Sequence, residues 1–85
     1  MIRYDAPFFR AMARVPPALR PRIVTTVESI GADHPSLPTE ADETVMLPPS
    51  GIRRHRRRVQ GTAWWVYYTF DDVDVLIRQV IVPMA

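Results

Sequence analysis

The last third of the chain alternates between apolar and polar side chains, and this period of two limits the possible folds more than any other feature. From Ile52 onward an arginine-rich stretch, an aromatic stretch and an apolar, β-branched stretch follow one another. Between them stand two pairs of turn-forming residues, Gly61-Thr62 and Asp71-Asp72. A period of two is typical of β-strands whose faces meet different surroundings. Residues 52–82 are therefore predicted to form an antiparallel β-meander that Pro83 ends.

Pairing the strands across these turns assigns each side chain to one face of the sheet. A first turn of two or four residues places Arg58 opposite Trp65. The same turn places Arg56 opposite Tyr67. A second turn, of two residues, places Arg78 opposite Trp65. One face then collects the predicted core of the sheet: Val59, Trp64, Val66, Tyr68, Phe70, Val73, Val75, Ile77 and Ile81.

The opposite face is the candidate binding surface for a nucleic acid or another target. Its predicted members are Arg54, Arg56, Arg58, Trp65, Tyr67 and Arg78. Leu76 and Val80 fall on this face too and predict an exposed apolar part. Arginines bind phosphates, and exposed aromatic rings beside them stack on bases. Arginines that serve only to keep a sheet face soluble need no exposed tryptophan beside them. Arg57 points toward the core, so we expect it to reach the sheet edge or to mark a bulge.

The N-terminal part predicts a short strand and two helices. Ile2 and Tyr4 flank Arg3 in the alternation of an edge strand. Apolar residues then recur at helical spacing in two groups that Pro16-Pro17 separates: Phe8, Phe9, Met12 and Val15, and then Leu19, Ile23, Val27 and Ile30. Asp5 is placed as the N-cap of the first helix, and Gly31 as the C-terminal cap of the second. The two helices form an α-hairpin whose apolar side covers the core face of the sheet.

Together these elements predict one α+β domain over residues 1–85, with an N-terminal α-hairpin packed on a twisted antiparallel sheet of three to four strands. The short strand and the α-hairpin occupy 2–31, and the meander occupies 52–82. The connection 32–51 is rich in proline and has no cation; its acidic residues are Asp33, Glu40, Asp42 and Glu43. Within it, 44–47 could pair as a short strand. This acidic segment either folds over the arginines as a nucleic-acid mimic or stays solvated, and we favour the solvated loop.

Several function classes find no support in the sequence. The chain has no cysteine, and its two histidines, His34 and His55, do not have the spacing of metal ligands. The predicted register turns His55 toward Tyr68 on the core side, which argues against a role as general base. No nucleophile motif or phosphate loop is present, so we assign no catalytic residue, no metal and no cofactor. No apolar run is long enough to cross a membrane and no signal peptide is evident, so a cytoplasmic location is expected.

The segment Arg56-Arg57-Arg58-Val59-Gln60-Gly61-Thr62-Ala63-Trp64-Trp65-Val66-Tyr67-Tyr68-Thr69-Phe70-Asp71-Asp72 fits a known frame. It resembles the basic-x-basic-Val-x-x-Gly pattern, followed by a strand and Asp-Asp, of the RelE/ParE superfamily of toxins from type II toxin–antitoxin modules. The resemblance extends to the order of elements over nearly the whole chain. It implies a RelE/ParE-like fold and a hetero-oligomer with a cognate antitoxin. The implied target is ribosome-bound mRNA or DNA gyrase.

The same resemblance bears on catalysis. In the ribosome-dependent RNases of the superfamily, basic residues of the sheet bind mRNA, and Arg56 and Arg58 match those positions. An arginine of the next strand and a basic, aromatic C-terminal tail complete that catalytic site. Trp65 stands at the position of the strand arginine, and the sequence stops at Ala85 before such a tail. These two departures argue against RNA cleavage and favour binding. If the chain is an enzyme, the resemblance implies a ribosome-dependent mRNA endoribonuclease. Two alternatives stay open: a non-toxic nucleic-acid-binding or adaptor domain, and a small oligomeric structural subunit.

Overall fold

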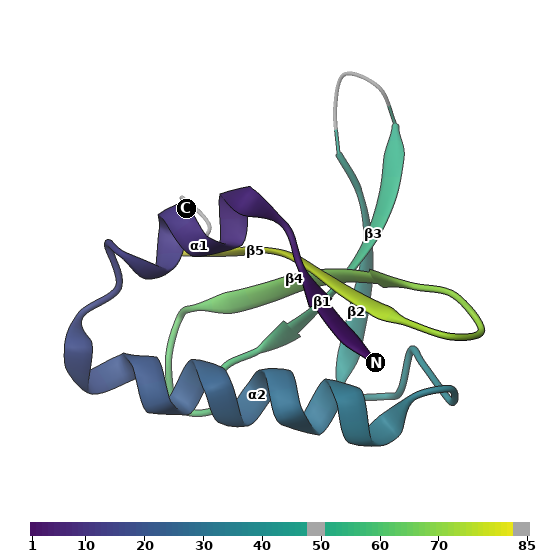
Figure 1. Cartoon of the computed structure of the whole chain (residues 1–85), viewed down its shortest axis with the longest axis horizontal. Coiled ribbons are helices and arrows are strands. Elements are labelled where there is room, and N and C mark those ends of the chain that lie inside the picture. Colours follow the sequence, from purple (N-terminus) through teal and green to yellow (C-terminus); the bar gives the residue numbers. More distant parts are fainter. Residues whose placement is uncertain (48–50, 83–85) are drawn as a thin grey trace.

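The strands of the chain form a single five-stranded sheet with helices packed on it (Figure 1). A computed structural model describes residues 1–47 and 51–82. Its elements are β1 (Ile2–Tyr4), α1 (Ala6–Met12), α2 (Arg20–Asp33), β2 (Asp42–Leu47), β3 (Ile52–Arg58), β4 (Trp65–Phe70) and β5 (Val75–Ile81). A short 3-10 turn, Pro17–Leu19, leads into α2. The predicted α+β class is confirmed, and the predicted end of the last strand at Pro83 lies outside the described residues.

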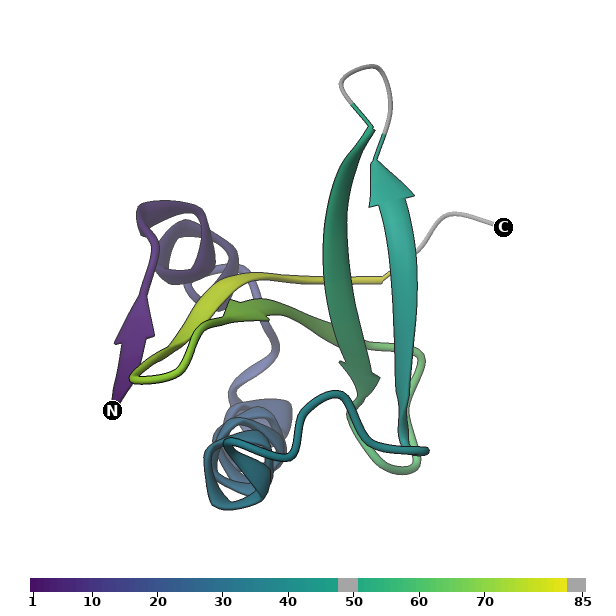
Figure 2. The same cartoon turned by 90° about the vertical axis from the view of Figure 1, so that its right-hand side faces the viewer.

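The sheet has the order β1-β5-β4-β3-β2 and contains both strand orientations. β1 runs parallel to β5, while the other neighbours are antiparallel. It is strongly twisted: Figure 2 shows β2 and β3 standing steeply across the direction of β4 and β5. The predicted edge strand and meander are therefore present, but the sheet has more strands than the three or four expected.

The additional strand, β2, comes from the acidic segment that we expected to be a solvated loop. Asp42, which the prediction left outside the possible strand 44–47, begins β2 and is paired with Arg57. Glu43 is paired with Arg56. Because neighbouring residues of a strand point to opposite faces, these two carboxylates lie on different sides of the sheet. Acidic residues are poor strand formers on their own, but an oppositely charged partner directly across the ladder offsets this cost.

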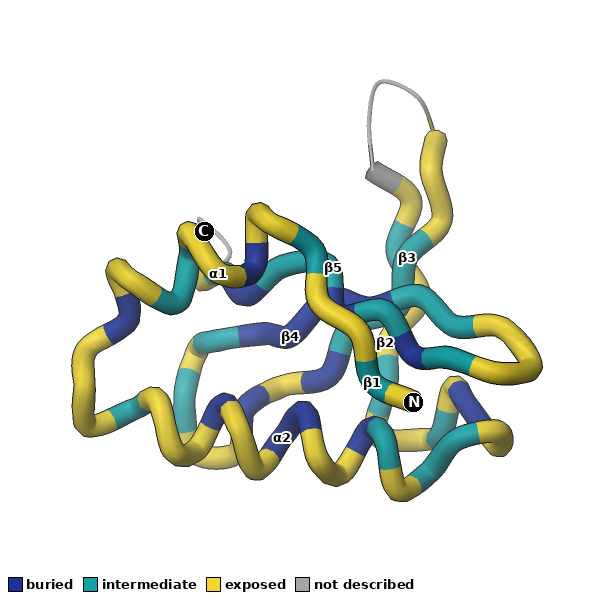
Figure 3. Tube along the Cα trace, viewed as in Figure 1, coloured by how far each residue is buried: buried dark blue, intermediate teal, exposed yellow. Residues whose placement is uncertain are grey.

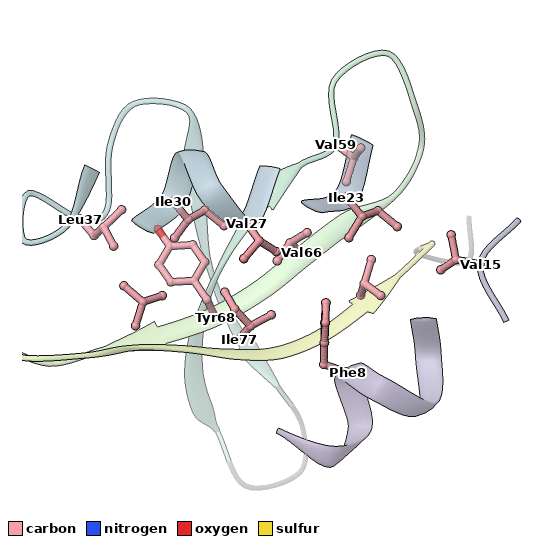
Figure 4. Packing of buried hydrophobic residues seen from close by; sticks show 12 residues of the cluster. Phe8, Val15, Ile23, Val27, Ile30, Leu37, Val59, Val66, Tyr68 and Ile77 are labelled. Carbon is pink, nitrogen blue, oxygen red and sulfur yellow. The ribbon is translucent and has the colours of Figure 1, made fainter. Parts of the chain in front are cut away.

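The core lies between α2 and the strands, with α1 closing one end along β5. α2 turns a row of buried residues toward the sheet, as the dark positions in Figure 3 show. Side chains from both helices and from the strands meet there in one cluster: Phe8, Val15, Ile23, Val27, Ile30, Leu37, Val59, Val66, Tyr68, Val75, Ile77 and Val80 (Figure 4). The apolar spacing predicted this role for α2 correctly. In α1, Phe8 is buried but Phe9 is exposed, contrary to the prediction.

Gly31 lies inside α2 and does not cap it, because the helix continues to Asp33. The absence of a side chain has a different reason. A Cβ atom at this position would come within 2.5 Å of Cδ1 of Ile2. Gly31 thus lets β1 approach the helix closely enough for Ile2 to pack between them.

The pairing of β3 with β4 is as predicted, and the pairing of β4 with β5 is not. Arg58 faces Trp65 and Arg56 faces Tyr67. The second turn has four residues because the Asp71 carboxylate accepts the backbone N–H groups of Val73 and Asp74, at 2.8 and 2.7 Å. Val73, which we expected in the core, is exposed in this turn.

A β-bulge in β5 reverses the face assignment of its last residues. The pairing steps from Tyr68 opposite Ile77 to Tyr67 opposite Gln79, which leaves Arg78 as the extra residue. Val80 is consequently turned into the core, whereas the prediction placed it on the candidate binding surface. Ile81 changes in the opposite sense and now stands across from Trp65. Arg78 is therefore not opposite Trp65, as had been expected.

Candidate functional site

The side of the sheet turned away from α2 carries a group of arginines and aromatic rings. It consists of Arg54, Arg56 and Arg58 of β3 with Trp65 and Tyr67 of β4, and we call it the arginine face. The cross-strand pairs Arg58–Trp65 and Arg56–Tyr67 place these residues side by side. Residues two apart in a strand stand about 6.6 Å from one another. The three arginines therefore form a regularly spaced row along one strand.

Trp65 and Tyr67 lie on this face but are buried, which corrects the prediction of an exposed tryptophan. Only 8% of Trp65 and 5% of Tyr67 is accessible. The guanidinium carbon of Arg56 lies 4.1 Å from the centre of the Trp65 ring, and that of Arg58 lies 4.9 Å from it. Both distances are in the range of cation–π contact. The arginines thus cover the tryptophan, so the outer surface offers guanidinium groups rather than an open aromatic ring.

Arg56 is the most constrained cation of the arginine face. Its Nη2 and Nε donate to Oε1 of Glu43 at 2.6 and 3.0 Å, and its Nη1 donates to the Tyr67 hydroxyl at 3.0 Å. Burial works against its charged form, but the hydrogen bonds to Glu43 and Tyr67 raise the pKa of Arg56 above its ordinary value. The side chain of Arg56 is 20% exposed and that of Glu43 is 53% exposed. This ion pair therefore remains open to solvent on the carboxylate side.

Arg54 and Arg78, two further arginines of the predicted site, differ in how they are held. Arg54 is half-buried, and its Nε atom has no hydrogen-bond partner among the residues that the structure describes. Arg78 is tied to the N-terminal part of the chain: Nη1 donates to Oδ2 of Asp5 at 2.7 Å, and Nε donates to the Thr69 hydroxyl at 3.1 Å. The structure therefore brings five of the six predicted site residues together on the arginine face and holds Arg78 through other partners.

On the opposite side of the sheet, Arg57 is the centre of a buried polar network. Sequence reasoning expected it to reach the sheet edge or to mark a bulge; instead it is 7% exposed in a regular ladder. Its Nε and Nη2 donate to the two carboxylate oxygens of Asp42 at 2.6 and 2.9 Å. The remaining N–H groups meet hydroxyl and carboxylate oxygens 2.9–3.1 Å away: those of Ser29, Asp33 and Thr39. A guanidinium has five N–H donors, and here each has an acceptor.

Asp42 is buried completely and its charge is kept by its partners. Besides Arg57, it accepts the Tyr68 hydroxyl at 2.8 Å and the Thr39 backbone N–H at 2.8 Å. Burial alone would raise the pKa of Asp42, but the hydrogen bonds from Arg57, Thr39 and Tyr68 outweigh it and lower that pKa. Burial and the bond to Asp42 raise the pKa of Tyr68. The charged groups of this network are thus hydrogen-bonded within the core, and we assign the network a structural role.

His55 lies on the core side of the sheet, and His34 lies beside the turn between β4 and β5. His55 faces Tyr68 as predicted, and its Nδ1 lies 2.8 Å from the Thr44 hydroxyl. Burial is the main effect on His55 and lowers its pKa. The charge of Asp42 raises this pKa and the charge of Arg53 lowers it, and the net shift is downward. His34 contacts the backbone oxygen of Asp71 through Nε2 at 2.7 Å. Neither belongs to the arginine face. Within residues 1–47 and 51–82, no group of three metal-ligating side chains is close enough to hold an ion, and no helix is both long and apolar enough to span a membrane.

Sequence reasoning missed Glu43, the carboxylate partner of Arg56 on the arginine face, and the partners of Arg57. Glu43 was assigned to a loop, although its place beside the possible strand 44–47 was a signal. Extending that strand by two residues sets both acidic side chains opposite arginines. The idea that the acidic segment contacts the arginines was thus closer to the structure than the solvated loop that we favoured.

Comparisons with known proteins connect this chain to a family only through its fold. No protein-family model matches the sequence, and no curated protein matches it. Solved structures do match. The archaeal RelE–RelB complex from Pyrococcus horikoshii OT3 aligns with a TM-score of 0.62 and 17% identity over 93% of this chain and 89% of that one. YafQ from E. coli strain BL21(DE3) aligns with a TM-score of 0.67 and 14% identity, over 94% and 89% of the two chains.

A third match is the E. coli DinJ–YafQ complex, with a TM-score of 0.55 and 17% identity over 94% of this chain and 89% of that one. All three similarities extend over nearly the full length of both chains. At such low identity they establish a shared fold and nothing finer. The expected likeness to the RelE/ParE superfamily is thus confirmed as a likeness of fold.

Proposed function

We propose that this protein is the toxin component of a type II toxin–antitoxin module and acts by binding through its arginine face. The shared fold with RelE and YafQ carries this proposal. Two of the matched structures are complexes of such a protein with a second chain, RelB or DinJ, which supports a cognate antitoxin as the partner. The expected setting is the bacterial cytoplasm, where the antitoxin holds the toxin in a hetero-oligomer.

The target that fits this face is a polyanion or an acidic surface. Arg56 and Arg58 stand at the positions where the resemblance places mRNA-binding residues, which favours ribosome-bound mRNA; DNA gyrase is the other target that the resemblance implies. We propose binding without RNA cleavage. The RNases of the superfamily use an arginine at the position of Trp65. Trp65 is buried under two guanidiniums and has no charge with which to stabilise a phosphate in a transition state.

Inducible expression without any partner tests the toxin proposal. The protein is produced in E. coli from a tightly controlled promoter, and growth is followed while recovery in the soluble fraction is measured. The proposal predicts growth arrest soon after induction, with cellular mRNA left intact when cleavage is mapped by primer extension. Normal growth at verified soluble levels would refute the toxin assignment. New mRNA 5′ ends that depend on induction would instead refute binding without cleavage.

A second function is supported by the arginine face itself. A row of regularly spaced guanidiniums suits the backbone of a single strand, so a non-toxic RNA-binding or adaptor domain is the alternative. Fluorescence anisotropy with a labelled oligouridine measures this binding as a function of salt. Tight, salt-dependent binding by a protein that leaves growth unaffected favours the adaptor. Binding that is insensitive to salt contradicts a phosphate-directed face in either function.

A further inference from the structure

Glu43 stands where a bound anion is expected. Of the described arginines of the face, Arg56 is the one whose guanidinium is already engaged by a carboxylate, with Oε1 of Glu43 at 2.6 Å from Nη2 and 3.0 Å from Nε. These are the two donors that a phosphate oxygen uses when it binds the side of a guanidinium. Glu43 is directly opposite Arg56 in the β2–β3 ladder, so the contact is part of the strand register.

The remaining contacts of Arg56 hold its guanidinium in place whichever anion is bound. Nη1 donates to the Tyr67 hydroxyl, and the group lies over the Trp65 ring. Glu43, in contrast, has more than half of its side chain exposed, and Arg56 is its one ion-pair partner among the described residues. The carboxylate can therefore turn into solvent while Arg56 stays where it is, which is what an exchange of anions requires.

We propose that Glu43 is an internal competitor that occupies Arg56 in place of a phosphate and thereby weakens the binding of a phosphate-bearing strand by the arginine face. This inference rests on the proposed function in that it assigns a phosphate-bearing single strand to the same face. A ligand reaches Arg56 only by displacing Glu43, and the displaced carboxylate then lies close to the incoming phosphate. Arg58 has no ion pair within residues 1–47 and 51–82, so its guanidinium can contact the nucleic-acid strand without a competing carboxylate.

The salt dependence of binding distinguishes a competing carboxylate from a neutral contact. Each phosphate neutralised on a single strand adds about 0.7 to the slope of log K against log salt. In the wild-type protein Arg56 exchanges one anion for another, so its contribution to the slope is close to zero. With Glu43→Gln, Arg56 becomes a free cation and contributes in full.

The test compares Glu43→Gln with the wild type in anisotropy titrations against labelled oligouridine at several salt concentrations. Glu28→Gln on α2 is the matched control, because it removes the same charge from an exposed helix position away from this face. We expect binding three- to fivefold tighter at about 0.1 M salt for Glu43→Gln, the factor that a half-exposed ion pair is worth, and a slope steeper by about 0.7. Glu28→Gln is expected to differ little from the wild type in slope.

Arg56→Ala completes a double-mutant cycle. In the wild-type background this change should leave the slope nearly unaltered, and in the Glu43→Gln background it should remove the added 0.7. Glu43→Thr repeats the test with a strand-forming residue that has no charge. Binding by the wild type with no gain in either Glu43 variant would overturn the inference and leave the proposed binding intact. No binding by any variant, even at low salt, would overturn the RNA-binding function itself and the inference with it.

Discussion

Two carboxylate–arginine pairs involve adjacent residues of β2 and differ mainly in burial, so they show how much burial alone changes the contribution of an ion pair to stability. Asp42 pairs with Arg57 on the core side, and Glu43 pairs with Arg56 on the arginine face. The Asp42 side chain is 0% exposed and that of Glu43 is 53% exposed. We expect Asp42→Asn to destabilise the protein severely and Glu43→Gln to destabilise it little.

The magnitudes follow from what each substitution leaves behind. Removing one partner of a buried pair costs about 3–5 kcal/mol, because the other charge stays buried. Asp33 lies 2.9 Å from Arg57 and is expected to remain its partner after Asp42→Asn, so the lower end, about 3 kcal/mol, applies. An exposed pair is worth about 0.2–1 kcal/mol, which sets the expectation for Glu43→Gln. A chain of this length is expected to have a total stability of about 8 kcal/mol, so we expect both variants to remain folded.

Urea titration followed by tryptophan fluorescence measures both free energies of unfolding, with Glu28→Gln as the control for a lost surface charge. A double variant, Asp42→Asn with Arg57→Met, should lose less than the sum of the single losses, by about 2 kcal/mol, since the two side chains interact directly. If the free energies of unfolding of Asp42→Asn and Glu43→Gln fall within about 1 kcal/mol of each other, the buried network around Arg57 does not stabilise the fold.

The same network and the first turn lead to further predictions. Because the folded state lowers the pKa of Asp42, the contribution of Asp42 to stability is present above the unfolded pKa near 3.8 and is lost as the pH falls through the folded pKa. Thermal melts should show a melting temperature that falls below about pH 4, and Asp42→Asn should reduce this fall. An equal dependence of the melting temperature on pH in the two proteins would contradict the prediction. Tyr68→Phe removes a hydroxyl that donates to Asp42 and should cost about 1–2 kcal/mol in urea titration, whereas no cost would mean that the hydroxyl is not bonded there. Gly61 has a φ of 76°, so Gly61→Ala should cost about 1 kcal/mol; a stabilised variant would show that the turn has another shape.

The parts of the fold that repeat with a clear period were predictable from the sequence. The alternation on both sides of Gly61 set the pairing of β3 with β4, and the helical spacing in α2 identified its buried side. The bulge in β5 was missed although the sequence has a sign of it: Arg78-Gln79 breaks the alternation between Ile77 and Val80. Two polar residues in succession shift the face of everything that follows.

The missed features depend on partners that are distant in the sequence. β2 has the composition of an acidic loop, and only the arginines across the ladder make it a strand. Alternation placed Trp65 and Tyr67 on the correct face, but it does not say where long side chains lie. The guanidiniums of Arg56 and Arg58 fold back over Trp65, so a residue on the outer face is nonetheless buried. Arg57 is the opposite case, a charge in the core whose partners come from α2, the connection that follows it and β2.

Growth after induction of two charge-reversed variants tests the central claim, that the arginine face is the working surface of a toxin-like protein. Arg58→Glu changes an exposed residue of this face, and Arg53→Glu makes the same change on the same strand at an exposed residue that points to the other side. With both variants folded and present at wild-type levels, we expect growth arrest by the wild type and by Arg53→Glu, and normal growth with Arg58→Glu. Equal arrest by Arg58→Glu would contradict it.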